Sequence, residues 1–219
     1  MNDIRFAGSL LVLSSIVIMI GTALNPHGFG DWGDTRALLG FLGGNPGLTS
    51  VSALVAMLGY ILFAAGFFGI RDSMFNGSGT RYMTLAGFFV IIGAAGFLIE
   101  SGLVVGAGGA AAAPEGRGMA TAIALITGAE GVGTLSLCAV SIGFALAGIS
   151  ILIQRNYHIV IGGLTAAIGI FALYAASDDY YSNLTQYAII AWLAMSLIIG
   201  VATITNKRSS LAHNTTPKS

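Results

Sequence analysis

Six long apolar stretches, separated by short polar segments, dominate the hydropathy pattern of this chain. They cover residues 6–24, 49–70, 82–106, 134–153, 157–176 and 184–205. Each is close to the ~20 residues with which an α-helix crosses a hydrocarbon core of ~30 Å. A membrane barrel would instead alternate apolar and polar residues with a period of two, and this chain does not. The pattern therefore predicts an all-α integral membrane bundle of six transmembrane helices.

Composition supports the same class. Hydrophobic residues make up 55% of the chain and charged residues only 8%, with a mean hydropathy of +0.86. Soluble domains are about one quarter charged, so a soluble fold is excluded. We expect residues 1–208 to form one six-helix transmembrane domain, and the polar residues 209–219 to be a disordered cytoplasmic tail.

The distribution of basic residues predicts how the bundle is oriented, because basic loops stay in the cytoplasm. Seven of the nine basic residues lie in the two ends of the chain or in the second and fourth loops: Arg5, Arg71, Arg81, Arg155, Lys207, Arg208 and Lys218. Only Arg36 and Arg117 lie in the odd-numbered loops. We therefore expect N and C termini in the cytoplasm and an acidic outer surface. Compact loops and the lack of organelle-targeting features favour the cell (cytoplasmic) membrane. A net charge of zero without a basic cluster argues against nucleic-acid binding.

The first apolar stretch has an alternative interpretation as a cleaved signal covering residues 1–23. Arg5 precedes it, and Gly21-Thr22-Ala23 offers small residues for cleavage. The apolar run is longer than the usual signal core of about 7 to 15 residues, which favours a span. Cleavage would leave five spans and an outer amino terminus.

Two further apolar pieces, Ala37–Leu42 and Met119–Thr127, are too short to cross a bilayer. We expect them to form short interfacial helices in the first and second outer loops. A continuous helix over residues 119–153 would be about 52 Å long, so the glycine-rich segment 128–133 is predicted to break it. The alternative is a pair of half-helices in two repeated hairpins, an arrangement that some transporters use.

The 32 glycines are too many for turns alone. Small residues inside spans let helix backbones approach closely, and Gly102 with Gly106, or Gly143 with Ala147, has the required spacing. Such positions favour tight packing within the bundle. A face for a membrane protein partner or for a homo-oligomer is the alternative.

Glu100 and Glu130 are the candidates for an ion or proton site. An acidic residue inside a span is costly and usually faces the bundle interior or a wet cavity. Glu100 is six residues from the outer end of its predicted span, which favours a position at the headgroups, with a buried functional position as the alternative. Glu130 could meet it from a neighbouring helix, where repulsion between the two carboxylates would let the pair hold a proton or bind a cation.

The first outer loop contains His27, Asp31 and Asp34, which are weak candidates for a cation site because they supply ligands that divalent metals accept. A glycine-rich surface turn without a metal explains the same residues. Gly28, Gly30 and Gly33 also have G-x-G-x-x-G spacing, but no strand precedes them, so the dinucleotide interpretation fails.

No cofactor and no catalytic residue is predicted. The three histidines lie outside the spans, where they could not ligate a haem within the bundle. No metalloprotease, hydrolase, dithiol or P-loop motif occurs, and Cys138 has no partner for an intrachain disulfide.

Three classes of function remain. The favoured one is a non-catalytic accessory or structural membrane subunit, in contact with the lipid bilayer and a partner. The alternative is a small cation- or proton-coupled carrier or channel that uses Glu100 and Glu130. A membrane-embedded enzyme is the third, and it would need polar side chains from several spans to converge.

Overall fold

The computed structural model describes residues 3–27, 34–74, 77–178, 180 and 182–205. These residues form helices only. Six of them are long: α1 (Asp3–Leu24), α3 (Pro46–Ser73), α4 (Thr80–Ala111), α5 (Met119–Gln154), α6 (Ile159–Asp178) and α7 (Asn183–Thr205). Two short elements, α2 (Thr35–Gly44) and the 3-10 helix η1 (Pro114–Gly116), lie between them.

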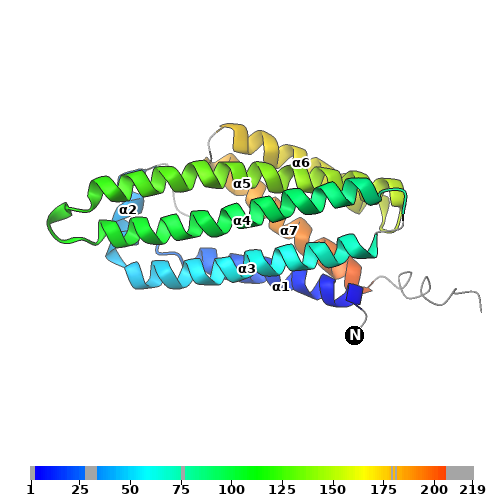
Figure 1. Ribbon diagram of the computed structural model, residues 1–219, viewed down its shortest axis with the longest axis horizontal. Helices are drawn as coiled ribbons and strands as arrows, with labels where there is room; N and C mark the ends of the chain where they lie inside the picture. The colour runs from blue at the N-terminus through cyan, green and yellow to red at the C-terminus, as the bar shows by residue number, and fades with distance from the viewer. Residues whose placement is uncertain (1–2, 28–33, 75–76, 179, 181, 206–219) are drawn as a thin grey trace, which may run out of the picture.

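The six long helices are apolar and long enough to cross a membrane, which confirms the predicted class of a six-helix membrane bundle. The start of α1 and the end of α7 lie at the same end of the bundle (Figure 1). We call this the basic end, because the connections at Arg71, Arg81 and Arg155 lie there. The opposite end is called the α2 end. Which end faces the cytoplasm remains a prediction.

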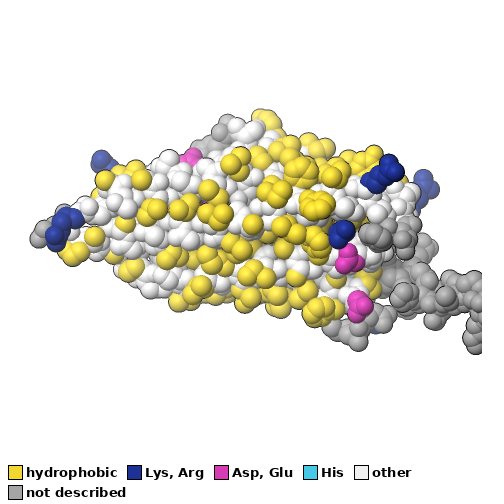
Figure 2. Space-filling view, in the orientation of Figure 1, with side chains coloured by type: hydrophobic (Ala, Val, Ile, Leu, Met, Phe, Trp, Pro, Cys, Tyr) yellow, Lys and Arg dark blue, Asp and Glu magenta, His cyan; other side chains and the backbone are white. Residues whose placement is uncertain are grey.

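The long helices form a closed ring. Each helix packs against the next long helix along the chain, and α7 returns to pack against α1. At the centre, Trp192 of α7 contacts the rings of Phe63, Phe97 and Phe144 from α3, α4 and α5. Large aliphatic side chains also cover the outside of the helices (Figure 2). A protein that is apolar inside and outside along its helices fits lipid as its solvent.

Glycines let these helices pack backbone to backbone. A Cβ at Gly8 of α1 would lie 2.8 Å from the carbonyl oxygen of Gly200 on α7, so neither helix could carry a side chain there. Gly143 makes a similar approach to α4, and Ala147 one turn later is buried. Packing within the bundle is therefore confirmed for this pair. Gly102 has open space beside it instead.

The predicted break in α5 is wrong. Residues 119–154 form one helix of 36 residues, about 54 Å long, which passes through the glycine-rich segment 128–133 without interruption. Met119–Thr127 is therefore the first part of α5 and not a separate interfacial helix. Glycine costs up to about 1 kcal/mol per position in a helix, but Ala122, Ile126 and Ala129 are buried against α2 and α4. This tertiary packing offsets the weak local propensity.

A short helix, α2, forms between α1 and α3, as expected. It covers Thr35–Gly44 and is therefore slightly longer than the predicted Ala37–Leu42. The carboxylate of Asp34 accepts hydrogen bonds from the amides of Arg36 and Ala37, which caps the start of α2. Three leucines, Leu38, Leu39 and Leu42, are fully buried against the ends of α4 and α5. A second small core therefore lies at this end, separate from the aromatic one. Whether α2 lies at a membrane interface remains a prediction.

Candidate functional site

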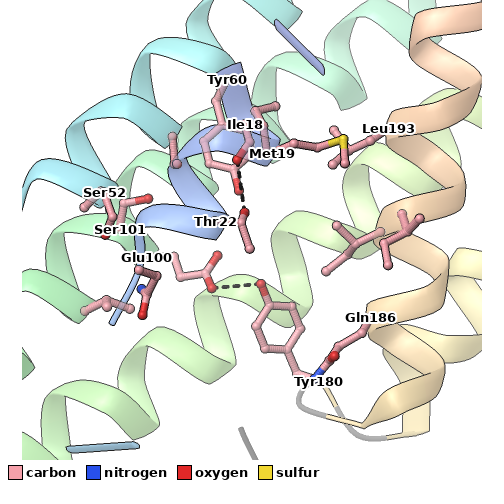
Figure 3. Close-up of a pocket in the computed structure, with 17 residues that line it drawn as sticks. Ile18, Met19, Thr22, Ser52, Tyr60, Glu100, Ser101, Tyr180, Gln186 and Leu193 are labelled. Carbon is pink, nitrogen blue, oxygen red and sulfur yellow. Dashed lines mark hydrogen bonds between the residues drawn. The ribbon is translucent and has the colours of Figure 1, made fainter. Parts of the chain in front are cut away.

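A cavity of about 180 Å³ opens in the part of the bundle toward the α2 end, between α1, α3, α4 and α7. Its polar lining residues come from all four helices and from the connection between α6 and α7 (Figure 3). They are Thr22, Asn25, Ser52, Tyr60, Glu100, Ser101, Tyr180 and Gln186. The rest of the wall is aliphatic, with glycine and alanine where helices approach closely.

Glu100 lies on the wall of this cavity. Because α4 continues to Ala111, its Cα is eleven residues, or about 16 Å, from the end of the helix. In the predicted span the same residue is six residues, or about 9 Å, from the end. Because α4 is about 48 Å long and a hydrocarbon core is about 30 Å thick, the position of Glu100 relative to the headgroups remains a prediction. The side chain lines the cavity and is only partly exposed.

Tyr180 holds the Glu100 carboxyl group in place. Its hydroxyl donates a hydrogen bond of 2.8 Å to Oε1 of Glu100 (Figure 3). The Tyr180 ring comes from the short connection between α6 and α7, and it lies against α5 at Gly133. The tyrosine therefore closes one side of the cavity and joins three parts of the fold.

Tyr60 places a second phenol at the cavity. Its ring stacks on Phe97 at a centroid distance of 4.8 Å, and Phe97 in turn stacks on Trp192 at 5.9 Å. The central aromatic cluster thus fixes the Tyr60 ring. Among the described residues, no group forms a hydrogen bond with the Tyr60 hydroxyl.

The aliphatic hydroxyls of the wall already donate their protons to the helices that carry them. Thr22 donates to the Ile18 carbonyl, Ser52 to that of Thr49 and Ser101 to that of Phe97. Their oxygen lone pairs therefore remain as acceptors toward the cavity. Among the residues that the structure describes, no lysine, arginine or histidine lines the cavity, and Glu100 is the one acidic residue that does.

Glu130 lies at the same level as Glu100 on the adjacent helix. α4 and α5 are antiparallel, and their contacts at Gly96 with Ser136 and at Gly128 with Leu103 lie on either side of the two glutamates. Glu130 is half-buried but is not among the residues that line the cavity. A direct Glu100–Glu130 pair therefore remains a prediction.

The first outer loop is only partly described. Asp34 serves as the cap of α2, and the ring of His27 lies 5.3 Å from that of Phe41. Asp31 lies outside the described residues. Over the part of the chain that the structure describes, no three His, Cys, Asp or Glu side chains group as metal ligands.

Comparison with known proteins finds no match. No family model, curated protein or solved structure is similar to this chain. The cavity itself therefore carries the functional argument. Sequence patterns identified Glu100, because an acidic residue in a span is conspicuous, but they did not identify Tyr60, Gln186 or Asn25. Tyr180 has no distinguishing pattern in the sequence, and only its contact with Glu100 identifies it.

Proposed function

We propose that this multi-pass membrane protein is a small cation- or proton-coupled carrier that binds its ligand at Glu100. One observation supports the proposal: a carboxyl group inside a transmembrane bundle lines a cavity large enough for a small molecule. A carboxylate inside a transmembrane bundle costs free energy, and membrane proteins tolerate this cost mainly at ion and substrate pathways.

The surroundings of Glu100 support reversible binding more than a structural role. A buried charge with a structural role is usually paired with an opposite charge, and none of the described residues of the cavity wall is basic. Instead, Glu100 has one phenol donor at 2.8 Å and faces open volume. A proton or a cation can enter and leave such a site without breaking an ion pair.

The test is flux into liposomes that contain the purified protein and a trapped pH indicator. We expect a pH or cation gradient to drive proton flux, and Glu100→Gln to lower the rate about tenfold or more, because glutamine keeps the shape and loses the charge. Glu130→Gln is the matched variant on α5. If only Glu100→Gln lowers the flux, a single carboxyl group serves the transport cycle. If Glu130→Gln lowers it as well, both members of the predicted pair take part.

Unchanged flux in Glu100→Gln would contradict the proposal. Each variant must first elute as a single species in detergent and unfold at a temperature close to that of the unmodified protein. A variant that fails this check is replaced by Glu100→Asp, which keeps the charge and shortens the side chain. Intermediate flux in Glu100→Asp supports the role of the carboxyl group, and full flux counts against a requirement for its position.

An accessory subunit of the cell membrane is the second candidate, favoured by one observation. Beside Gly102, α3 and α4 form a shallow apolar groove lined by Ala53, Leu54, Met57 and Val105. Small residues beside a groove allow the backbone of a helix from another protein to approach closely. Purification from native membranes tests this role: a partner that is lost in Gly102→Leu would support it, and a protein that travels alone would not.

A further inference from the structure

We propose that the ligand of the Glu100 cavity is a protonated organic amine with a small alkyl or aryl body. This inference rests on the proposed function and specifies its substrate class. It follows from the hydrogen-bonding groups, the charge, the size and the apolar part of the wall.

Among the described lining groups, the Glu100 carboxylate and three hydroxyls can only accept hydrogen bonds, while Asn25, Gln186 and Tyr60 carry groups that can also donate. The hydroxyl oxygens of Thr22, Ser52 and Ser101 can only accept from a ligand, since their protons are already donated to helix carbonyls. Glu100 adds a carboxyl group with one oxygen bonded to Tyr180. A ligand rich in N–H groups would satisfy these atoms, whereas a carboxylate or phosphate would face Glu100 with no basic residue among the described wall residues to balance it.

A single carboxyl group also limits the charge of the ligand. Magnesium and calcium need about six or more oxygen ligands, usually with several carboxylates. Of the described wall residues, Glu100 alone supplies a carboxylate, so a divalent ion bound to these residues would keep an unbalanced charge in an apolar environment. A monovalent cation is balanced by one carboxylate.

The volume of the cavity and its apolar wall favour an organic cation over a proton or an alkali ion as the ligand. A dry cavity of about 150 Å³ binds benzene in another protein, so 180 Å³ accommodates a body of similar or slightly larger size. Ile18, Ile189 and Leu193 give the wall its apolar part. Figure 3 shows Met19 and Leu193 on the side of the cavity away from Glu100. A molecule with an ammonium group at one end and a hydrocarbon body at the other matches this division.

Aromatic rings add to the recognition of a cation. Tyr60 and Tyr180 both line the cavity, and the face of a tyrosine ring attracts an ammonium group within about 6 Å. The Tyr60 hydroxyl, which has no hydrogen-bond partner among the described residues, can accept from an ammonium group as well as donate. Two phenols and one carboxyl group thus surround the polar part of the volume.

The test measures binding of benzylamine to the detergent-purified protein by calorimetry at pH 7, where this amine is protonated. We expect saturable binding that Glu100→Gln weakens about tenfold or more, because a charge-assisted hydrogen bond is lost. Benzyl alcohol has the same body without the charge, and we expect it not to bind. Ala53→Leu keeps Glu100 and fills part of the cavity, so it should also weaken binding.

The outcomes separate this inference from the proposed function. If benzylamine binds but drives no flux in liposomes, the ligand class stands and the carrier role fails. If proton flux depends on Glu100 but benzylamine does not bind, the carrier role stands and the ligand class is wrong. Benzylamine binding that both Glu100→Gln and Ala53→Leu leave unchanged would place the amine elsewhere and overturn the inference.

Discussion

The ring of Tyr180 occupies the space that a side chain at position 133 would fill. A Cβ on Gly133 would lie 2.7 Å from the Tyr180 hydroxyl oxygen, far inside van der Waals contact. The same hydroxyl donates to Glu100 at 2.8 Å. A glycine on α5 therefore lets a residue from the α6–α7 connection reach a carboxyl group on α4.

We predict that Gly133→Ala displaces Tyr180 and breaks its hydrogen bond to Glu100. Overpacking of this kind costs about 1 to 3 kcal/mol, so the unfolding temperature in detergent should fall. Benzylamine binding should weaken in the same direction as in Tyr180→Phe, since both variants release the Glu100 side chain from its donor.

Gly131→Ala is the matched control, because nothing lies within 4 Å of a Cβ at that position. Alanine is the better helix former by up to about 1 kcal/mol, so this variant should be as stable as the unmodified protein or more so. In a Tyr180→Ala background, Gly133→Ala should no longer lower the unfolding temperature, because the clashing ring is absent. If it remains as destabilising there, the clash involves some group other than Tyr180.

Local sequence was sufficient to identify the spans, because a continuous apolar run of about 20 residues has few other uses. The ends were less exact. The predicted span 82–106 is helical from Thr80 to Ala111, since small residues after Gly106 continue the helix although their hydropathy is modest. Five extra residues place Glu100 eleven residues from the end of its helix in place of six, and whether it lies at the interface or in the interior remains a prediction.

Long-range contacts explain what the sequence could not predict. Three glycines in residues 128–133 resemble a helix break, but buried contacts with α2 and α4 keep α5 continuous. Tyr180 and Glu100 are 80 positions apart in the chain, and no local pattern joins them. The sequence alone therefore identified Glu100. The other residues of the site could be identified only from the arrangement of the helices.

A second prediction concerns the packing of α2. A helix of ten residues is too short to be stable alone, so its three buried leucines must hold it against α4 and α5. We expect Leu39→Ala to cost about 2 to 5 kcal/mol and to speed hydrogen exchange of the α2 amides. Phe41→Ala removes a side chain that is 51% exposed, so it should change exchange much less. Equal exchange in both variants would mean that the leucines do not anchor α2.

A third prediction concerns Tyr157, which lies at the basic end between α5 and α6. Its buried hydroxyl donates to Oγ1 of Thr203 at 2.8 Å, because that threonine already donates to the Ile199 carbonyl. Burial raises the pKa of the Tyr157 phenol, because the phenolate would lose its hydration. The folded protein therefore keeps this proton at a pH where the unfolded chain loses it.

The sign of the pH dependence follows from this order of pKa values. The contribution of Tyr157 is complete below about pH 10, the ordinary range of tyrosine, and is lost as the pH rises further. We expect Tyr157→Phe to lower stability by about 1 kcal/mol near pH 7, because the hydrogen bond is lost. Between pH 10 and pH 11 it should lose stability less steeply than the unmodified protein. Tyr187→Phe removes an exposed phenol and serves as the control; an identical slope in Tyr157→Phe would contradict the argument.

The last prediction tests the orientation that the basic residues imply. Cys138 is the only cysteine, so a Cys138→Ser background allows single reporter cysteines. Ser78 is an exposed residue at the basic end, and Asn183 is an exposed residue at the α2 end. In intact cells, an impermeant maleimide should label Asn183→Cys and not Ser78→Cys, while both should react after the membrane is opened. The reverse labelling would place the basic end outside, and the Glu100 cavity, which lies toward the α2 end, would then face the cytoplasm.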